Sequence, residues 1–122
     1  ISKVLRGKNK PTYNPHMDNG DFVVVTNIDK IKFSGKKFHN KKYYRHTGHP
    51  GGIKESTPFS LKEKNKTEQI LKLAVKRMLP GGPLAKKQLT KLKIYNGENH
   101  PHETQKPKVI NFEQLNKKNV IK

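Results

Sequence analysis

Residues 21–28, DFVVVTNI, carry the clearest strand signal in the sequence. Within them, Phe22-Val23-Val24-Val25 is an unbroken apolar run without polar alternation. Such a run is typical of a strand that is buried on both faces, as in a parallel sheet. Shorter strands are predicted for IKFSG at residues 31–35, KKYYRHT at 41–47 and KIYNG at 93–97. Of the adjacent Tyr43 and Tyr44, one is expected in the core, because neighbouring strand residues point to opposite faces.

A helix is predicted over residues 66–79, because apolar side chains recur there at helical spacing. Thr67 is the expected N-cap, and Glu68 suits the positive end of the helix dipole. The sequence PGGP at residues 80–83 ends this helix. The apolar stripe comprises Ile70, Leu71, Ala74, Val75, Met78 and Leu79. Other helices are predicted for residues 1–6, 58–64 and 84–92.

Strands followed by helices, with one doubly buried strand, predict a layered α/β domain. Glycine and proline mark loops at residues 7–20 and 48–52. Residues 111–122 are polar and rich in Lys and Asn, and are interpreted as an extension. We expect residues 7–20, 47–52 and 111–122 of the isolated chain to be partly disordered, which hydrogen exchange would test.

The composition points to a polyanionic partner. The chain has 122 residues, with 27 Lys and Arg against 9 Asp and Glu and a formal net charge of +18. Only 30% of the residues are hydrophobic, which is low for a chain that must bury its own core. Nucleic acid is the commonest polyanionic partner. A membrane-active protein would need an amphipathic helix with a bulky apolar face, which the sequence lacks.

Catalytic and metal-binding functions find little support. The chain has no Cys, so thiolate sites are excluded, and its six histidines include only the close pairs His46/His49 and His100/His102. No nucleophile elbow or phosphate-binding loop pattern is present. The positive field would depress carboxyl pKa values and so disfavour a general acid. We expect no enzyme activity, no cofactor, no metal site and no small-molecule substrate.

Three groups of basic residues are interleaved with rings and glycines. They are LRGKNKPTYNPH at residues 5–16, YYRHTGHPGGIK at 43–54, and the lysines and arginine that surround the Pro-Gly junction between the last two helices. Lysines and arginines can neutralise phosphates, glycines let backbone N–H groups approach them, and rings can stack on unpaired bases. Any single lysine could equally belong to a solvated surface, but three such groups in one small chain predict RNA binding. The third group comprises Lys76, Arg77, Lys86, Lys87, Lys91 and Lys93.

Four blocks of sequence resemble the family of bacterial-type ribosomal protein L-thirteen. They are LRGKNKPTYNPHMDNGDFVVVTN, KKYYRHTGHPGGIKE, LAVKRMLPGGPLAKKQLTKLKIYNG and HPHETQKP, in this order. The resemblance implies a three-layer α/β/α domain around a small, mostly parallel sheet, with extended basic loops and a C-terminal tail. It assigns residues 1–110 to an rRNA-binding domain that lacks the family's N-terminal strand, followed by the polar extension at residues 111–122.

The same resemblance implies a structural constituent of the large ribosomal subunit, which binds large-subunit rRNA and supports early assembly. Its partners would be this rRNA and neighbouring large-subunit proteins, with no membrane involved. The residues that it predicts to face rRNA are Arg6, Gly7, Lys8, Lys10, His16, Arg45, His46, His49, Gly51, Gly52, Lys76, Arg77 and Lys87. The alternative function is a regulator that binds mRNA or DNA outside the ribosome. Frequent Lys, Asn and Ile favour an organellar, mitochondrial ribosome over the bacterial cytoplasm.

Overall fold

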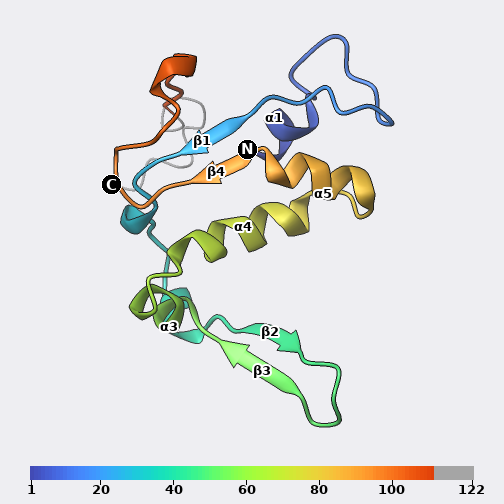
Figure 1. Ribbon diagram of the computed structural model, residues 1–122. Coiled ribbons are helices and arrows are strands. Elements are labelled where there is room, and N and C mark those ends of the chain that lie inside the picture. The colour runs from blue at the N-terminus through green and yellow to red at the C-terminus, as the bar shows by residue number, and fades with distance from the viewer. Residues whose placement is uncertain (112–122) are drawn as a thin grey trace.

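A computed structural model describes residues 1–111 of the chain. Figure 1 shows an α/β body, which combines elements from both the early and the late parts of the chain, and a β-hairpin that projects away from it. The elements, in chain order, are α1 (Ser2–Arg6), β1 (Val23–Val25), the 3-10 helix η1 (Ile28–Lys30), α2 (Lys37–Asn40), β2 (Tyr43–His46), β3 (Ile53–Ser56), α3 (Pro58–Glu63), α4 (Thr67–Met78), α5 (Pro83–Thr90), β4 (Leu92–Ile94) and the 3-10 helix η2 (Glu103–Gln105).

Strands β1 and β4 form a small parallel sheet, in which Val23 lies opposite Leu92 and Val25 opposite Ile94. The predicted α/β fold with a parallel sheet is therefore confirmed. The second pair, β2 and β3, is an antiparallel hairpin in a separate sheet. The sequence pattern predicts β2 but not β3, because the sequence IKES at residues 53–56 has almost no apolar character.

Helix α4 contributes to two hydrophobic clusters. Its Val75, together with the C-cap residue Leu79, packs with Leu5 of α1 and Leu92 of β4, next to partly buried residues of α5 and β1. Its Ile70 packs instead with Tyr43 and Leu61, which belong to β2 and α3. The helical stripe predicted for residues 66–79 is thus confirmed as a core face, although Met78 is 68% exposed. By this arrangement α4 connects the body to the base of the hairpin.

Two sequence predictions about strands were wrong. Residues 31–35 form no strand, because Ile31 and Phe33 pack individually against the second hydrophobic cluster and Gly35 then turns the chain with a φ of 63°. The strand expected over residues 21–28 is only three residues long and partly buried, and Phe22 is 72% exposed. It ends where Asn27 adopts a left-handed conformation and Ile28 enters η1.

The N-cap expected for α4 was also wrong, while a cap at α3 was not anticipated. Lys66 occupies the N-cap position of α4, and Thr67 is the first helical residue, 2% exposed. At α3, the Thr57 hydroxyl accepts a hydrogen bond from the Ser60 N–H at 3.2 Å, and the Ser60 hydroxyl accepts one from the Thr57 N–H at 3.3 Å. This reciprocal pair is a capping box, and it fixes the turn between the hairpin and α3.

Replacing Thr57 with alanine should lower the free energy of unfolding by about 1 kcal/mol, because the Ser60 N–H loses the hydroxyl oxygen to which it donates. Equilibrium denaturation in guanidinium would measure the loss. Thr57→Ser is the matched control, since it keeps the hydroxyl and should stay close to wild type. Equal midpoints for both variants would contradict a role for the cap.

Candidate nucleic-acid interface

The first basic group lies at the end of α1 and in the loop that follows. Gly7 ends the helix with a φ of 78°, and its N–H donates to the Val4 carbonyl at 3.0 Å. A Cβ at Gly7 would lie 2.9 Å from the carbonyl oxygen of Asn19, so the loop returns very close to α1. Gly20 comes closer still, because a Cβ there would overlap the backbone carbonyl of Leu5. Both glycines are therefore needed to close this loop.

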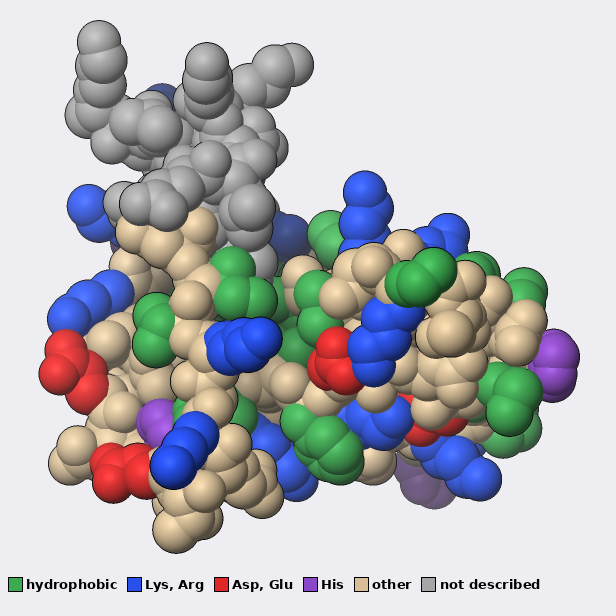
Figure 2. Space-filling model, turned by 90° about the horizontal axis from the view of Figure 1, so that it is seen from above, with side chains coloured by type: hydrophobic (Ala, Val, Ile, Leu, Met, Phe, Trp, Pro, Cys, Tyr) green, Lys and Arg blue, Asp and Glu red, His purple; other side chains and the backbone are tan. Residues whose placement is uncertain are grey.

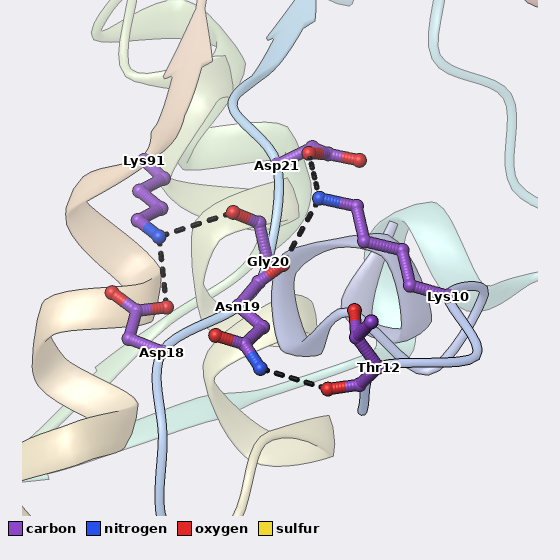
Figure 3. Close-up of polar contacts among 7 residues, drawn as sticks. All are labelled: Lys10, Thr12, Asp18, Asn19, Gly20, Asp21 and Lys91. Atoms are coloured by element: carbon purple, nitrogen blue, oxygen red, sulfur yellow. Dashed lines mark hydrogen bonds and ion pairs between the residues drawn. The ribbon is translucent and has the colours of Figure 1, made fainter. Parts of the chain in front are cut away.

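Figure 3 shows the polar contacts that hold the loop in place. The ammonium of Lys10 donates to the Asp21 carboxylate at 2.6 Å and to the Asn19 carbonyl at 3.1 Å. The ammonium of Lys91 donates to the Gly20 carbonyl at 3.1 Å and forms an ion pair with Asp18 at 2.8 Å. The loop is thus tied both to itself and to the start of β4.

These contacts separate the lysines that bind acceptors within the chain from those that remain exposed. Lys10, which was predicted to face rRNA, already has two acceptors within the chain, so holding the loop is a role that the sequence analysis missed. Lys91 was assigned to the third basic group, but its side chain is only 15% exposed and turns inward. The predicted residues that remain exposed on the loop are Lys8 and His16.

Tyr13 contacts two of the basic side chains in this region, those of Arg6 and Lys8. Tyr13 accepts a hydrogen bond from the Arg6 guanidinium at 3.1 Å, and the Lys8 ammonium lies 5.9 Å from the centre of its ring. Arg6 and Lys8 are therefore held on one aromatic side chain rather than free to move independently. Arg6 is half-buried, whereas Lys8 is exposed.

The second basic group forms the β2–β3 hairpin. Its tip is closed by hydrogen bonds from the Thr47 N–H to the Gly52 carbonyl and from the Gly52 N–H to the His49 carbonyl, at 2.9 and 3.0 Å. Gly51 has a φ of 69°, and a Cβ at Gly52 would overlap the Thr47 hydroxyl, so both predicted glycines are required by the turn. The side chains of Arg45, His46 and His49 are exposed.

The two strands of the hairpin present different chemistry on their two faces. Arg45 lies opposite Lys54, whereas His46 lies opposite Ile53 on the same face as Tyr44. The Gly48 N–H donates to His46 Nδ1 at 2.9 Å, so in the neutral ring the proton resides on Nε2, which is then a hydrogen-bond donor. Tyr44 is 58% and Ile53 is 63% exposed, and only Tyr43, at the base, is buried. The expected split between the two tyrosines is confirmed.

An isolated two-stranded hairpin is marginally stable in water, and this one has its polar and apolar side chains exposed on both faces. The Glu55 carboxylate, at 2.8 Å, raises the pKa of Lys42 across the strands. This ion pair and the buried Tyr43 hold the base, while the basic tip extends beyond the body (Figure 1). Such a projecting basic ribbon is suited to contact an external polyanion.

Most of the third basic group lies on α4 and α5, on either side of the Pro-Gly turn, while Lys91 follows α5 and Lys93 lies in β4. Lys76, Arg77 and Lys87 are all exposed. Burial raises the pKa of Tyr43 at the hairpin base, and the positive charge of Arg77 opposes this rise. Since Ile70 of α4 packs against Tyr43, this helix and the base of the hairpin are held together.

Figure 1 shows how the three groups are arranged. The loop after α1, the turn between α4 and α5, and the tip of the hairpin all project toward the right-hand side of this view. Viewed from above, Lys and Arg side chains are scattered along the length of the molecule and outnumber the acidic side chains (Figure 2). A partner that bridges the three groups would have to be extended and negatively charged.

Within residues 1–111, no three His, Asp or Glu side chains gather closely enough to hold a metal ion. None of the helices in this described part is long and apolar enough to cross a membrane. His100 and His102 contact each other and Tyr95, whose hydroxyl lies 2.8 Å from His102 Nε2. These two histidines therefore have partners within the chain.

The family described as Ribosomal protein L13 matches residues 1–101, which is more than four-fifths of the chain. The chain belongs to the ribosomal protein L13 family. The resemblance noted from the four sequence blocks is confirmed. As a member of the L13 family, a family of structural ribosomal proteins, the chain is not an enzyme, in agreement with the expectation from its residues.

Individual L13 relatives are similar over almost the whole chain. The large ribosomal subunit protein uL13 of Neorickettsia sennetsu is 55% identical over 98% of this chain and 78% of its own length. The proteins of the same name from Agrobacterium fabrum and Mesorhizobium japonicum are 53% and 52% identical, again over 98% of this chain and over 78% and 77% of theirs. All three relatives are bacterial.

Proposed function

We propose that this chain is a structural constituent of the large ribosomal subunit that binds large-subunit rRNA and supports early assembly of the subunit. The observation that carries the proposal is the combination of L13 family membership with three exposed basic groups on projecting segments. RNA meets the requirement for an extended polyanion, and its unpaired bases can stack on exposed rings such as Tyr44. Neighbouring large-subunit proteins are proposed as further partners.

The residues proposed to face rRNA divide by their chemistry. Lys8, His16, Arg45, His46 and His49 are exposed cations or donors on the two loops. On α4 and α5, Lys76, Arg77 and Lys87 supply positive charge for phosphates. Arg6 and Lys10, together with the glycines at 7, 51 and 52, are proposed to shape the loops that present these groups.

Binding should be tested with transcribed large-subunit rRNA of Agrobacterium fabrum and an unrelated structured RNA of similar length. We expect at least about a tenfold preference for the rRNA to persist at 200 mM salt, where counterion release has weakened nonspecific binding. Co-sedimentation with large subunits would extend the result to the particle. Equal affinity for both RNAs at every salt concentration would contradict the proposal.

The alternative function is regulation of an mRNA or DNA outside the ribosome, and it would be favoured if the chain left the subunit at moderate salt. An organellar, mitochondrial location remains a separate prediction from composition. The relatives described above are bacterial and do not support it. Fractionation of the source cells would decide between the two locations.

A further inference from the structure

Four aromatic rings from separate segments gather beside the base of the hairpin, outside the three basic groups. Phe33 precedes α2, Phe38 and His39 belong to α2, and Phe59 belongs to α3. The Phe38 ring centre lies 6.0 Å from that of Phe33, 5.2 Å from His39 and 5.9 Å from Phe59. The rings of His39 and Phe59 are 5.2 Å apart, so the four side chains form one cluster, called here the ring cluster.

The ring cluster has a buried side and an exposed side. Phe33 packs against the second hydrophobic cluster, and Phe38 is half-buried. Phe59 is 41% exposed, and His39 is also exposed. The inner rings therefore anchor the outer two, which are held close together at the surface without being part of the core. Rings fixed in this way lose little conformational entropy when a planar ligand stacks on them.

The surroundings of the ring cluster are strongly basic. Residues 30–42 include six lysines and no Asp or Glu, and the Lys62 ammonium lies 6.0 Å from the centre of the Phe38 ring. Lys30 and Lys42 are paired with Glu98 and Glu55. The exposed lysines of this segment that form no ion pair within residues 1–111 are Lys32, Lys36, Lys37 and Lys41.

We propose that the ring cluster is a stacking site for an unpaired RNA base, with the flanking lysines neutralising the adjacent phosphates. This deepens the proposed function, on which it rests, by naming a fourth contact surface and the form of RNA that it recognises. A protein partner could cover the rings, but it would have to compensate four unpaired lysines as well. An RNA strand supplies a planar ring and the negative charge at a fixed spacing, which matches both parts of the surface.

The test compares the full-length chain with His39→Ala/Phe59→Leu, which removes the two outer rings and leaves every lysine in place. Phe22→Leu is the matched control, because Phe22 is 72% exposed but lies outside the ring cluster. The probes are a uridine 12-mer and an abasic 12-mer with the same number of phosphates. Thermal unfolding followed by circular dichroism would verify that all variants are folded.

Wild type and Phe22→Leu should prefer the uridine 12-mer, and in the double variant this preference should fall by about tenfold, the effect of losing one stacked base. The affinity for the abasic 12-mer and its salt dependence should not change, since no phosphate contact is removed. An unchanged base preference in the double variant would overturn the proposal, as would no base preference in wild type. In large subunits, cross-links from His39 or Phe59 to a nucleotide would support it, and cross-links only to another protein would overturn it.

These results are independent of the test of ribosomal function. A chain that prefers large-subunit rRNA but shows no ring-dependent base preference retains the proposed function and lacks this site. A chain with ring-dependent base preference and equal affinity for both long RNAs has the stacking site without the ribosomal specificity.

Discussion

Replacing Arg45, His46 and Arg77 together with alanine should lower the affinity for large-subunit rRNA by at least about 1000-fold, because three hydrogen bonds to charged groups are lost and each is worth ~1.5–3 kcal/mol. The three side chains are exposed, and α4 packs on the base of the hairpin through Ile70 and Tyr43, so we expect one stretch of RNA to contact all three. The loss of two full charges should also reduce the dependence of log affinity on log salt by about 2. Filter binding over a salt series would measure both effects.

The matched control is Lys64→Ala/Lys108→Ala, which removes two charges from exposed residues outside the proposed interface. We expect this control to lose much less affinity than the triple variant. If both variants lost the same affinity, binding would depend on net charge alone, and the proposed residues would have no special role.

Replacing Gly20 with alanine should destabilise the chain by about 3 kcal/mol, at the upper end of the usual cost of overpacking. The new Cβ would overlap the carbonyl of Leu5, whose side chain is completely buried, so neither backbone segment can move without disturbing the core. The loop that carries Lys8 and His16 would be displaced at the same time. For a domain of this size, the expected fall in Tm is more than about 10 °C.

Gly81→Ala is the matched control, since a Cβ at Gly81 would meet no atom within 4 Å. Equilibrium denaturation and thermal unfolding of the two variants would isolate the effect of position from that of the added methyl group. A Gly20→Ala protein as stable as Gly81→Ala would show that the loop does not pack on α1 as described.

Local patterns predicted those parts of the fold that depend on local sequence. The stripe through Ile70, Val75 and Leu79 placed α4 correctly, because side chains at helical spacing share one face whatever they pack against. The same pattern rule failed at residues 31–35. Ile31 and Phe33 alternate like strand residues, but a strand also needs a neighbour to receive its hydrogen bonds, and a short sequence cannot reveal that neighbour.

The candidate interface was predictable to the same extent. Exposed basic residues such as Arg45 and Lys87 were predicted from the basic composition of the surrounding sequence and from the family resemblance. The internal roles of Lys10 and Lys91 were not predicted, because the sequence does not show whether a lysine side chain contacts solvent or a carboxylate of the same chain. The close approach of Gly20 to the Leu5 backbone could not be predicted either, since the turn residues Asn19-Gly20 do not indicate which segment packs against them. The ring cluster likewise depends on contacts between α2 and α3.

The contact between Lys91 and the loop at Asp18 and Gly20 has a consequence for the order of synthesis. Lys91 and Gly20 are 71 residues apart, and the lysine stands about three-quarters of the way along the chain. During translation the loop at residues 7–20 is synthesised early, but Lys91, which holds it in place, is synthesised late. The loop therefore reaches its final shape only once β4 has been made, so a nascent chain presents the hairpin's basic residues before it can present a fully formed loop.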